Sequence, residues 1–211
     1  MRSAWGTIVD LTYIAMAAWW PSTIGSRAQR WVTREFYRYR ADRYDAGVAH
    51  GGAWYGEPLR AALAHLGDVP SSILDVNTGT GYAVLVLASF FPHARIAACD
   101  LSPQMLCRAA VNGEGAGRQF LLVQANAGDL PYQNGAFDLV VSHNAPPPLR
   151  EMARVLQPGG ACVVCFSSGA GVPRRLREAF TQQLRRWGIS EIQTGRVARG
   201  LFVLGRKTAR C

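Results

Sequence analysis

The 211-residue sequence has almost no lysine: Lys207 is the one lysine among 23 basic residues, and the others are arginines. It also contains no run of about 18 uncharged apolar residues, so no membrane-spanning helix is predicted. Five cysteines are an odd number in a chain long enough to fold without disulfides, which predicts a reduced, cytoplasmic protein. With 49% hydrophobic and only 18% charged residues, the chain is predicted to form a packed core.

The net charge of +9 is unevenly distributed. Residues 1–45 carry a net charge of +3, residues 46–171 carry −2 and residues 172–211 carry +8. The neutral middle argues against a protein that binds nucleic acid over its whole surface. The basic flanks suit contact with an anionic surface, or they form a solvated basic face without a partner.

Short apolar runs alternate with helical segments from residue 73 onward. Strands are predicted at residues 73–77, 95–100, 119–124, 137–142, 161–166, 190–194 and 200–205. Helices are predicted at residues 82–91, from Pro103 to about Asn112, and at 149–156 and 173–187. This alternation predicts an α/β fold whose mainly parallel sheet is covered by helices on both faces.

A glycine-rich turn joins the first predicted strand to the helix that follows it. In the run Asp75-Val76-Asn77-Thr78-Gly79-Thr80-Gly81, the two glycines can adopt positive φ and let a ligand approach the backbone. Asp100 ends the next strand, where a carboxylate can accept hydrogen bonds from both ribose hydroxyls of a nucleoside. The third glycine of a dinucleotide motif would fall at Val84, and no Walker motif is present. The turn therefore predicts a nucleoside ligand without phosphates.

Four sequence blocks carry a family resemblance. They are D-x-N-x-G-x-G with C-D-L-S-P-Q-M-L, and the segments at residues 125–132, 135–142 and 153–160. Together they resemble the class I S-adenosylmethionine-dependent methyltransferases, in particular the ubiquinone- and menaquinone-biosynthesis branch. The resemblance implies a Rossmann-like, doubly wound, mostly parallel seven-stranded sheet at residues 46–211, preceded by a helical cap at residues 1–45. It also implies S-adenosylmethionine as cofactor, S-adenosylhomocysteine as product and no metal.

The same resemblance assigns residues to the cofactor. Asp75 would lie near its amino-acid end, Asp100 would bind its ribose, and Asn126 with Ala127 would read the adenine edge. The full set of predicted cofactor-binding residues is Asp75, Asn77, Thr78, Gly79, Gly81, Asp100, Leu101, Met105, Asn126, Ala127 and Ser142.

Two positions depart from the family pattern. Asn77 replaces the first glycine of the turn, and Asn126 replaces the usual adenine-reading aspartate. Asparagine tolerates the left-handed conformation better than most residues, and its side-chain oxygen can still accept a hydrogen bond from an amino group. Both changes are compatible with cofactor binding, but they leave open a catalytically silent relative that only binds the cofactor.

The acceptor is predicted to bind at the end of strand 137–142. His143 could orient or deprotonate an acceptor because histidine titrates near neutral pH, or it could be a spacer at the strand end. Asn144, shortly before a run of three prolines, resembles the asparagine of amino-group methyltransferases and is the second predicted catalytic residue. Because the segment before Leu149 is short, the acceptor pocket is expected to be open.

The first 45 residues combine arginines at helical spacing with aromatic side chains. This pattern suits a helix lying on an anionic membrane, or a cap helix whose Tyr37 or Tyr44 lines the acceptor pocket. The predicted activity is methyl transfer to a small or amphipathic acceptor, such as a phospholipid amine or a quinone head group, at the inner face of the membrane. The alternatives are an RNA methyltransferase that uses the basic segment 172–211, which is less favoured, and the silent cofactor-binding protein.

Overall fold

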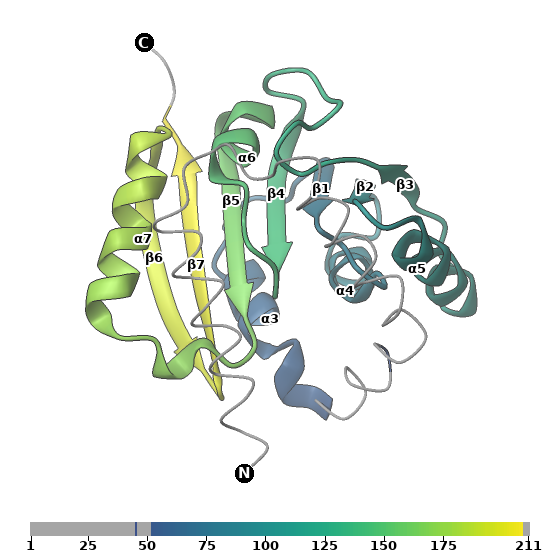
Figure 1. The fold of residues 1–211 in the computed structure, drawn as a ribbon, viewed down its shortest axis with the longest axis horizontal. Coiled ribbons are helices and arrows are strands. Elements are labelled where there is room, and N and C mark those ends of the chain that lie inside the picture. Colours follow the sequence, from purple (N-terminus) through teal and green to yellow (C-terminus); the bar gives the residue numbers. More distant parts are fainter. Residues whose placement is uncertain (1–44, 46–51, 209–211) are drawn as a thin grey trace.

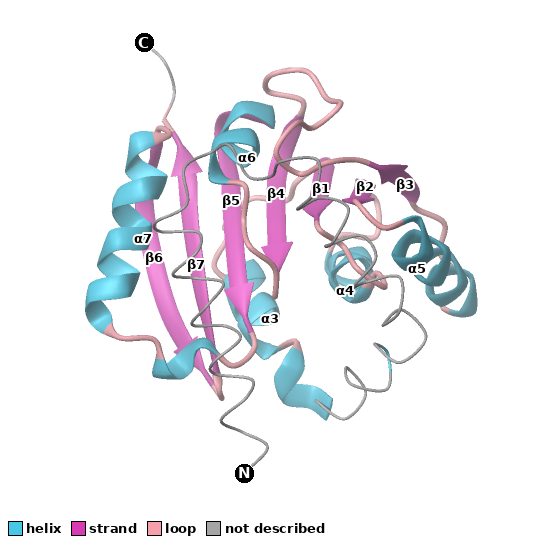
Figure 2. Cartoon of the chain, in the orientation of Figure 1, coloured by secondary structure: helices cyan, strands magenta, loops and turns pink. Residues whose placement is uncertain are grey.

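The computed structural model describes Asp45 and residues 52–208, which form a seven-stranded sheet with helices on both faces (Figures 1 and 2). The strands are β1 (Ser72–Val76), β2 (Arg95–Asp100), β3 (Leu121–Gln124), β4 (Phe137–His143), β5 (Leu156–Phe166), β6 (Ile189–Val197) and β7 (Gly200–Lys207). The helices are α3 (Glu57–Ala64), α4 (Tyr82–Phe90), α5 (Pro103–Gly115), α6 (Leu149–Val155) and α7 (Arg174–Arg186), with short 3₁₀ turns η1 (Gly52–Tyr55) and η2 (Gly169–Gly171).

The strand order is β3-β2-β1-β4-β5-β7-β6. Strands β1 to β5 are parallel to one another, whereas β7 runs antiparallel between β5 and β6. The predicted mostly parallel, seven-stranded sheet is therefore confirmed. From β1 the chain continues to β2 on one side, and β4 lies on the other, which creates a switch point at the carboxyl ends of β1 and β4. Open α/β sheets bind their ligands at such a point.

Alternating side chains divide the core into two layers. Leu74 and Val76 of β1 pack with α6 and α7, whereas Ile73 packs with α3 and α4 on the opposite face. The same alternation places Cys162 in the first layer and Cys165 in the second. Because apolar residues of β4, β5 and β7 contribute to both layers, the switch point is held by a sheet that is buried on its two faces.

Two elements differ from the sequence prediction. Helix α3 was not predicted, although Leu59, Ala62 and Leu63 bury one face of it at helical spacing. Strand β5 begins at Leu156, five residues before the predicted start, because Leu156 pairs with Phe137. The register then shifts before the regular pairing resumes, as expected where a bulge inserts extra residues into one strand.

The predicted cap at residues 1–45, with Tyr37 and Tyr44, lies outside the described residues except for Asp45. The domain boundary after residue 45 therefore stays a prediction. Within residues 52–208, no helix is both long and apolar enough to cross a membrane.

Candidate functional site

The turn between β1 and α4 adopts the left-handed backbone that its sequence predicts. The φ angles of Asn77, Gly79 and Gly81 are 60°, 56° and 87°. A side chain on Gly81 would place its Cβ 3.1 Å from the Cβ of Ala109 in α5, so the glycine allows the turn to pack closely against that helix. Around Gly79, by contrast, a Cβ would meet no atom of the described residues within 4 Å. The turn is thus tightly held on one side and open at Gly79.

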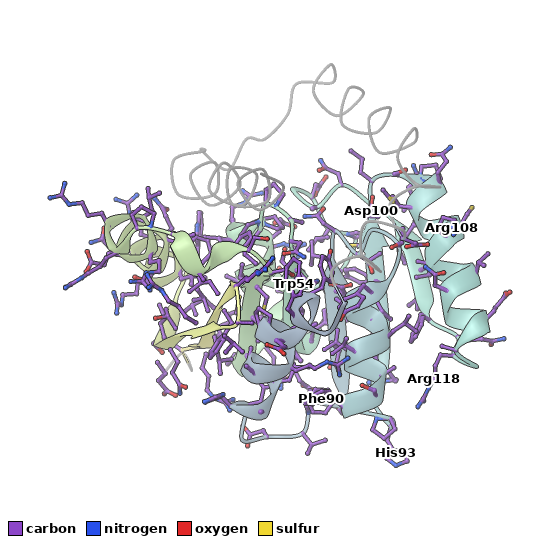
Figure 3. All side chains as sticks on the ribbon, turned by 90° about the horizontal axis from the view of Figure 1, so that it is seen from below. Trp54, Phe90, His93, Asp100, Arg108 and Arg118 are labelled. Carbon is purple, nitrogen blue, oxygen red and sulfur yellow. The ribbon has the colours of Figure 1, made fainter. Side chains whose placement is uncertain are left out.

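Asp100, at the carboxyl end of β2, fixes this turn. Its Oδ2 accepts a hydrogen bond from the Gly79 N–H at 2.9 Å, and its Oδ1 accepts one from the Ser102 N–H at 2.9 Å. Burial raises the pKa of Asp100, and the backbone N–H groups that bind its carboxylate oppose this rise. Figure 3 places Asp100 on the opposite side of the molecule from Phe90 and His93. The carboxylate therefore joins the glycine turn to the start of α5 at the predicted ligand-binding edge.

Three buried polar side chains near this turn have no hydrogen-bond partner among the described residues: Asp75, Thr78 and Ser142. Burial raises the pKa of Asp75 to about 7, and the charge of Asp100 adds to the rise; the neighbouring Thr78 hydroxyl opposes it, although its geometry is too poor for a hydrogen bond with the carboxyl. Buried polar atoms are nearly always hydrogen-bonded in folded proteins, and exceptions call for a specific explanation. Exceptions at the carboxyl ends of the neighbouring strands β1 and β4, where the switch point lies, indicate a site for a polar ligand.

The predicted adenine-reading residues follow β3. The Ala125 N–H donates to the Asp100 carbonyl at 3.0 Å, which holds this segment beside the end of β2. The Asn126 Oδ1 accepts from the Gly128 N–H at 3.1 Å and so stabilises the local turn. Ala127, which follows Asn126, is half-buried against the core layer of α6 and α7.

Two further predicted residues lie at the start of α5. Leu101 follows Asp100 directly and is half-buried. Met105 is fully buried, and its backbone N–H donates to the Ser102 Oγ at 3.4 Å in the N-terminal cap of the helix. The structure therefore gives Met105 a packing position beneath the site.

His143, at the end of β4, is enclosed by two tyrosines. Its ring centroid lies 5.2 Å from that of Tyr55 in an edge contact and 5.7 Å from that of Tyr82 in a stacked one. Burial lowers the pKa of His143 to about 4, and the Tyr55 carbonyl opposes this shift. The imidazole is therefore neutral near pH 7. Because Tyr82 is the first residue of α4, His143 also touches the helix that follows the glycine turn.

Asn144 is tied to Ser167, the residue after β5. Its Oδ1 accepts from the Ser167 N–H at 2.7 Å, and its Nδ2 donates to the Ser167 Oγ at 2.8 Å. The Ser167 Oγ also lies 3.2 Å from the Nε2 of His143. The structure thus brings the two predicted catalytic residues together around a serine that the sequence analysis missed. No sequence motif marks Ser167, because its neighbours are 23 and 24 residues away and meet it only through the pairing of β4 with β5.

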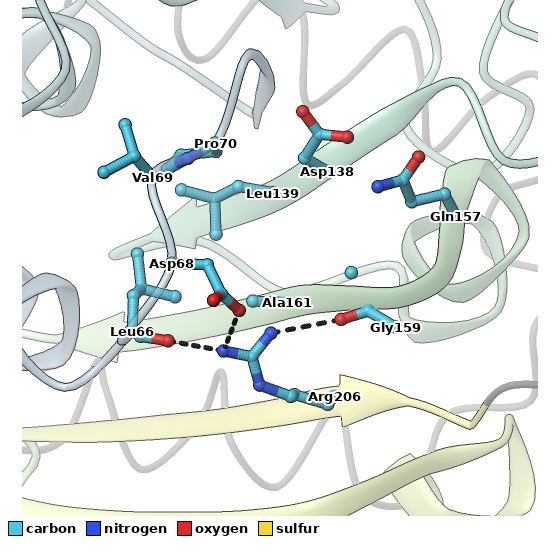
Figure 4. A pocket seen from close by; sticks show the side chains of 11 residues that line it. Leu66, Asp68, Val69, Pro70, Asp138, Leu139, Gln157, Gly159, Ala161 and Arg206 are labelled. Atoms are coloured by element: carbon cyan, nitrogen blue, oxygen red, sulfur yellow. Dashed lines mark hydrogen bonds and ion pairs between the residues drawn. The ribbon is translucent and has the colours of Figure 1, made fainter.

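A hollow of about 320 Å³ lies at the other end of the sheet (Figure 4). Its Arg206 is bound by the Asp68 carboxylate at 2.8 Å, the Gly159 carbonyl at 3.1 Å and the Leu66 carbonyl. None of the predicted site residues lines this hollow. As for metals, residues 52–208 and Asp45 contain no group of three or more His, Cys, Asp or Glu side chains that could hold an ion.

Residues 73–160 match a protein-family model described as "Methyltransferase domain". The chain resembles a solved structure from Methanococcus maripaludis, described as that of a "putative s-adenosyl-l-methionine-dependent methyltransferase", with a TM-score of 0.69. That alignment covers 82% of this chain and 94% of the other at 20% identity. Residues 73–160 thus match a methyltransferase domain by sequence, and the chain shares the Rossmann-like fold of the solved structure.

Two relatives with assigned substrates are similar over part of their length. The demethylmenaquinone methyltransferase of Thermus thermophilus is 37% identical over 112 residues, covering 50% of this chain and 51% of the relative. The malonyl-[acyl-carrier protein] O-methyltransferase of Methylococcus capsulatus is 35% identical over 160 residues, covering 72% of this chain and 56% of the relative. The chain therefore spans about half the length of these two relatives.

Proposed function

We propose that the protein transfers a methyl group from S-adenosylmethionine to a small or amphipathic acceptor. The observation that carries the proposal is the set of three buried, unpartnered side chains, Asp75, Thr78 and Ser142, at the switch point beside the anchored Asp100. Such a cluster costs stability in the free protein, and a polar ligand that satisfies it offsets the cost.

S-adenosylmethionine fits these residues by its chemistry. Its amino-acid end carries an ammonium group that can donate hydrogen bonds to the Asp75 carboxylate. Each Asp100 oxygen accepts one backbone N–H and keeps a lone pair, so this carboxylate can also accept from two ribose hydroxyls. The bound cofactor supplies a methyl group that is already activated on a sulfonium. The remaining task of the protein is to align the acceptor with that methyl group and to exclude water.

For the acceptor, we propose a lipid or quinone head group. The names of the relatives support small or carrier-bound acceptors, a demethylmenaquinone in one case and a malonyl-[acyl-carrier protein] in the other. A membrane-bound acceptor would suit the arginines and aromatic residues of the first 45 residues. Flotation with anionic liposomes at low salt tests this location, and a protein that stays in solution would refute it.

An RNA acceptor is the second candidate, because the basic surplus of segment 172–211 lies on the surface. Arg174, Arg175, Arg185 and Arg186 of α7 are exposed, and so is Arg199 in the turn between β6 and β7.

Incubation with a labelled donor and a total cell extract, followed by separation into lipid, RNA, protein and small-molecule pools, distinguishes the candidates. Label in the lipid pool supports the first and label in the RNA pool the second. Cofactor binding without label in any pool supports a silent protein.

Calorimetry with S-adenosylhomocysteine tests the site itself. Asp100→Ala removes the acceptor of two backbone N–H groups and of the ribose hydroxyls, so we expect the affinity to fall by about a hundredfold or more. Asp68→Ala is the matched control, because Asp68 is an exposed carboxylate at the other end of the sheet. Unchanged affinity in Asp100→Ala would refute the assignment of the cofactor site.

A further inference from the structure

The hydrogen bonds around Ser167 can each be given a direction. The Ser167 backbone N–H can only donate, and it donates to the Asn144 Oδ1 at 2.7 Å. This contact fixes the orientation of the amide, so the Asn144 NH₂ group faces the Ser167 Oγ, 2.8 Å away, and donates to it. One lone pair of the Ser167 hydroxyl is therefore occupied.

The proton of this hydroxyl has a fixed destination as well. The Tyr55 carbonyl oxygen lies 2.5 Å from the Ser167 Oγ, and a carbonyl can only accept a hydrogen bond. Ser167 therefore donates its single proton to Tyr55. The hydroxyl oxygen can still accept one hydrogen bond through its second lone pair. The His143 Nε2 lies 3.2 Å from this oxygen.

A hydrogen bond to that lone pair needs a proton on the Nε2 of His143. A neutral imidazole carries one N–H, so the proton on Nε2 leaves Nδ1 as the nitrogen with a free lone pair. The ring cannot easily turn to exchange the two nitrogens, because Tyr55 and Tyr82 pack against it. Burial lowers the pKa of His143 to about 4, so the ring is neutral and carries a single N–H.

We infer that Ser167 is a positioning residue that holds His143 as its Nε2–H tautomer and leaves Nδ1 as the ring nitrogen that can accept a hydrogen bond from an acceptor. The part of this inference that concerns the acceptor rests on the proposed function. A lone pair at Nδ1 accepts a hydrogen bond from a hydroxyl or an amine and orients that group toward the methyl donor. It repels a carboxylate, which has no proton to donate. The acceptor class that fits is thus an O–H or N–H group.

In this arrangement Asn144 acts on Ser167 through both atoms of its amide group. Its backbone N–H donates to the Cys165 carbonyl at 2.8 Å. Asn144 starts the chain of directed hydrogen bonds that ends at His143. Both residues predicted to be catalytic therefore belong to one hydrogen-bonded network around Ser167.

The nitrogen-15 spectrum of the histidine ring tests the tautomer without any assay of activity. In the wild type we expect a protonated-type Nε2 resonance and an unprotonated-type Nδ1 resonance for His143 at pH 7. In Ser167→Ala we expect both resonances to move toward the averaged position of exchanging tautomers, whereas Ser167→Thr, which keeps a hydroxyl, retains the wild-type pattern. Ser89→Ala is the control, because it removes a serine hydroxyl bound to the Val86 carbonyl on α4.

The outcome in the wild type decides the first part even if Ser167→Ala does not fold. A proton on Nδ1 in the wild type would overturn the inference, and so would a Ser167→Ala spectrum equal to that of the wild type.

For the acceptor class, phenol and benzoate are added in turn to protein saturated with S-adenosylhomocysteine. We expect phenol to shift the Nδ1 resonance and benzoate to leave it unchanged; no shift with phenol, or an equal shift with benzoate, would overturn this part. If calorimetry detects no cofactor binding while the tautomer is as stated, the proposed function fails and the assignment of Ser167 stands.

Discussion

The two ends of the sheet differ in how their polar groups are satisfied. At the carboxyl ends of β1 and β4, Asp75 and Ser142 are buried without hydrogen-bond partners among the described residues. At the other end, beside the hollow of about 320 Å³, the Asp138 carboxylate accepts three hydrogen bonds and Arg206 is held by several oxygens (Figure 4). The difference supports the proposal that the ligand binds at the end with unsatisfied buried groups and not in the hollow.

The carboxyl-end site is expected to lower the stability of the free protein in favour of binding. Functional sites often violate the rules that stabilise the rest of a fold. At the opposite end, the same residue types should contribute to stability and not to cofactor affinity. Substitutions at the two ends should therefore separate binding from folding.

The largest effect is expected for Asp75→Asn, measured by urea unfolding between pH 4 and pH 8. The pKa of Asp75 is raised from 3.8 to about 7 in the folded state, so between these values the folded protein binds more protons than the unfolded one. Its contribution to stability is present below pH 3.8 and is lost as the pH rises through 7. An asparagine side chain does not ionise, so the variant avoids this loss of stability. It should be more stable than the wild type by about 4 kcal/mol at pH 8 and nearly equal in stability at pH 4.

Cofactor binding should respond to the same substitution in the opposite direction. The Asp75→Asn side chain lacks the charge that attracts an ammonium group, so affinity for S-adenosylmethionine should fall, with the largest difference above pH 7. His143, whose pKa is lowered from 6.5 to about 4, loses stability as the pH falls through this range in both proteins, and the difference between them isolates Asp75. A variant that is less stable than the wild type at pH 8 would contradict the proposed role of Asp75.

The next effect is expected for Asp138→Ala at the opposite end. The Asp138 Oδ2 accepts from the Ser71 N–H, the Ser71 hydroxyl and the Ser72 N–H at 2.8, 2.6 and 2.9 Å, which ties β4 to the start of β1. Loss of these bonds should cost about 1–3 kcal/mol of stability. Calorimetry should find the affinity for S-adenosylhomocysteine unchanged. A decrease comparable to that of Asp100→Ala would remove the distinction between the two ends.

The sequence was enough to predict the half of the fold that contains the proposed cofactor site. The strands around Asp75 and Asp100 are short apolar runs bounded by turn residues, so local pattern and tertiary structure agree there. Helix α3 was missed because its four buried positions lie in a short segment without a strong capping signal. The early start of β5 was missed because Pro158 and two glycines usually end a strand, whereas here a register shift accommodates them.

The site was predictable only where its residues are close in sequence. The glycine turn and Asp100 belong to one β-α-β unit, and a motif of fixed spacing describes them. The network around Ser167 is different, because Tyr55, His143 and Asn144 reach it from distant parts of the chain. Which hydroxyl meets which ring depends on strand order and register. No local pattern contains that information.

The smallest effect is expected when one glycine at each end of the sheet is replaced by alanine. This pair of substitutions sharpens the comparison between the two ends. Gly81 in the turn and Gly159 beside the hollow have similar φ angles of 87° and 80°, so alanine should cost each about 1–2 kcal/mol of stability through the left-handed backbone. Only at Gly81 would the new Cβ press on Ala109, whereas at Gly159 it would meet no described atom within 4 Å. Gly81→Ala should therefore also weaken S-adenosylhomocysteine binding by displacing the turn that Asp100 holds, and Gly159→Ala should not. Unfolding and calorimetry on both variants give the result, and equal affinities would show that the turn tolerates the displacement.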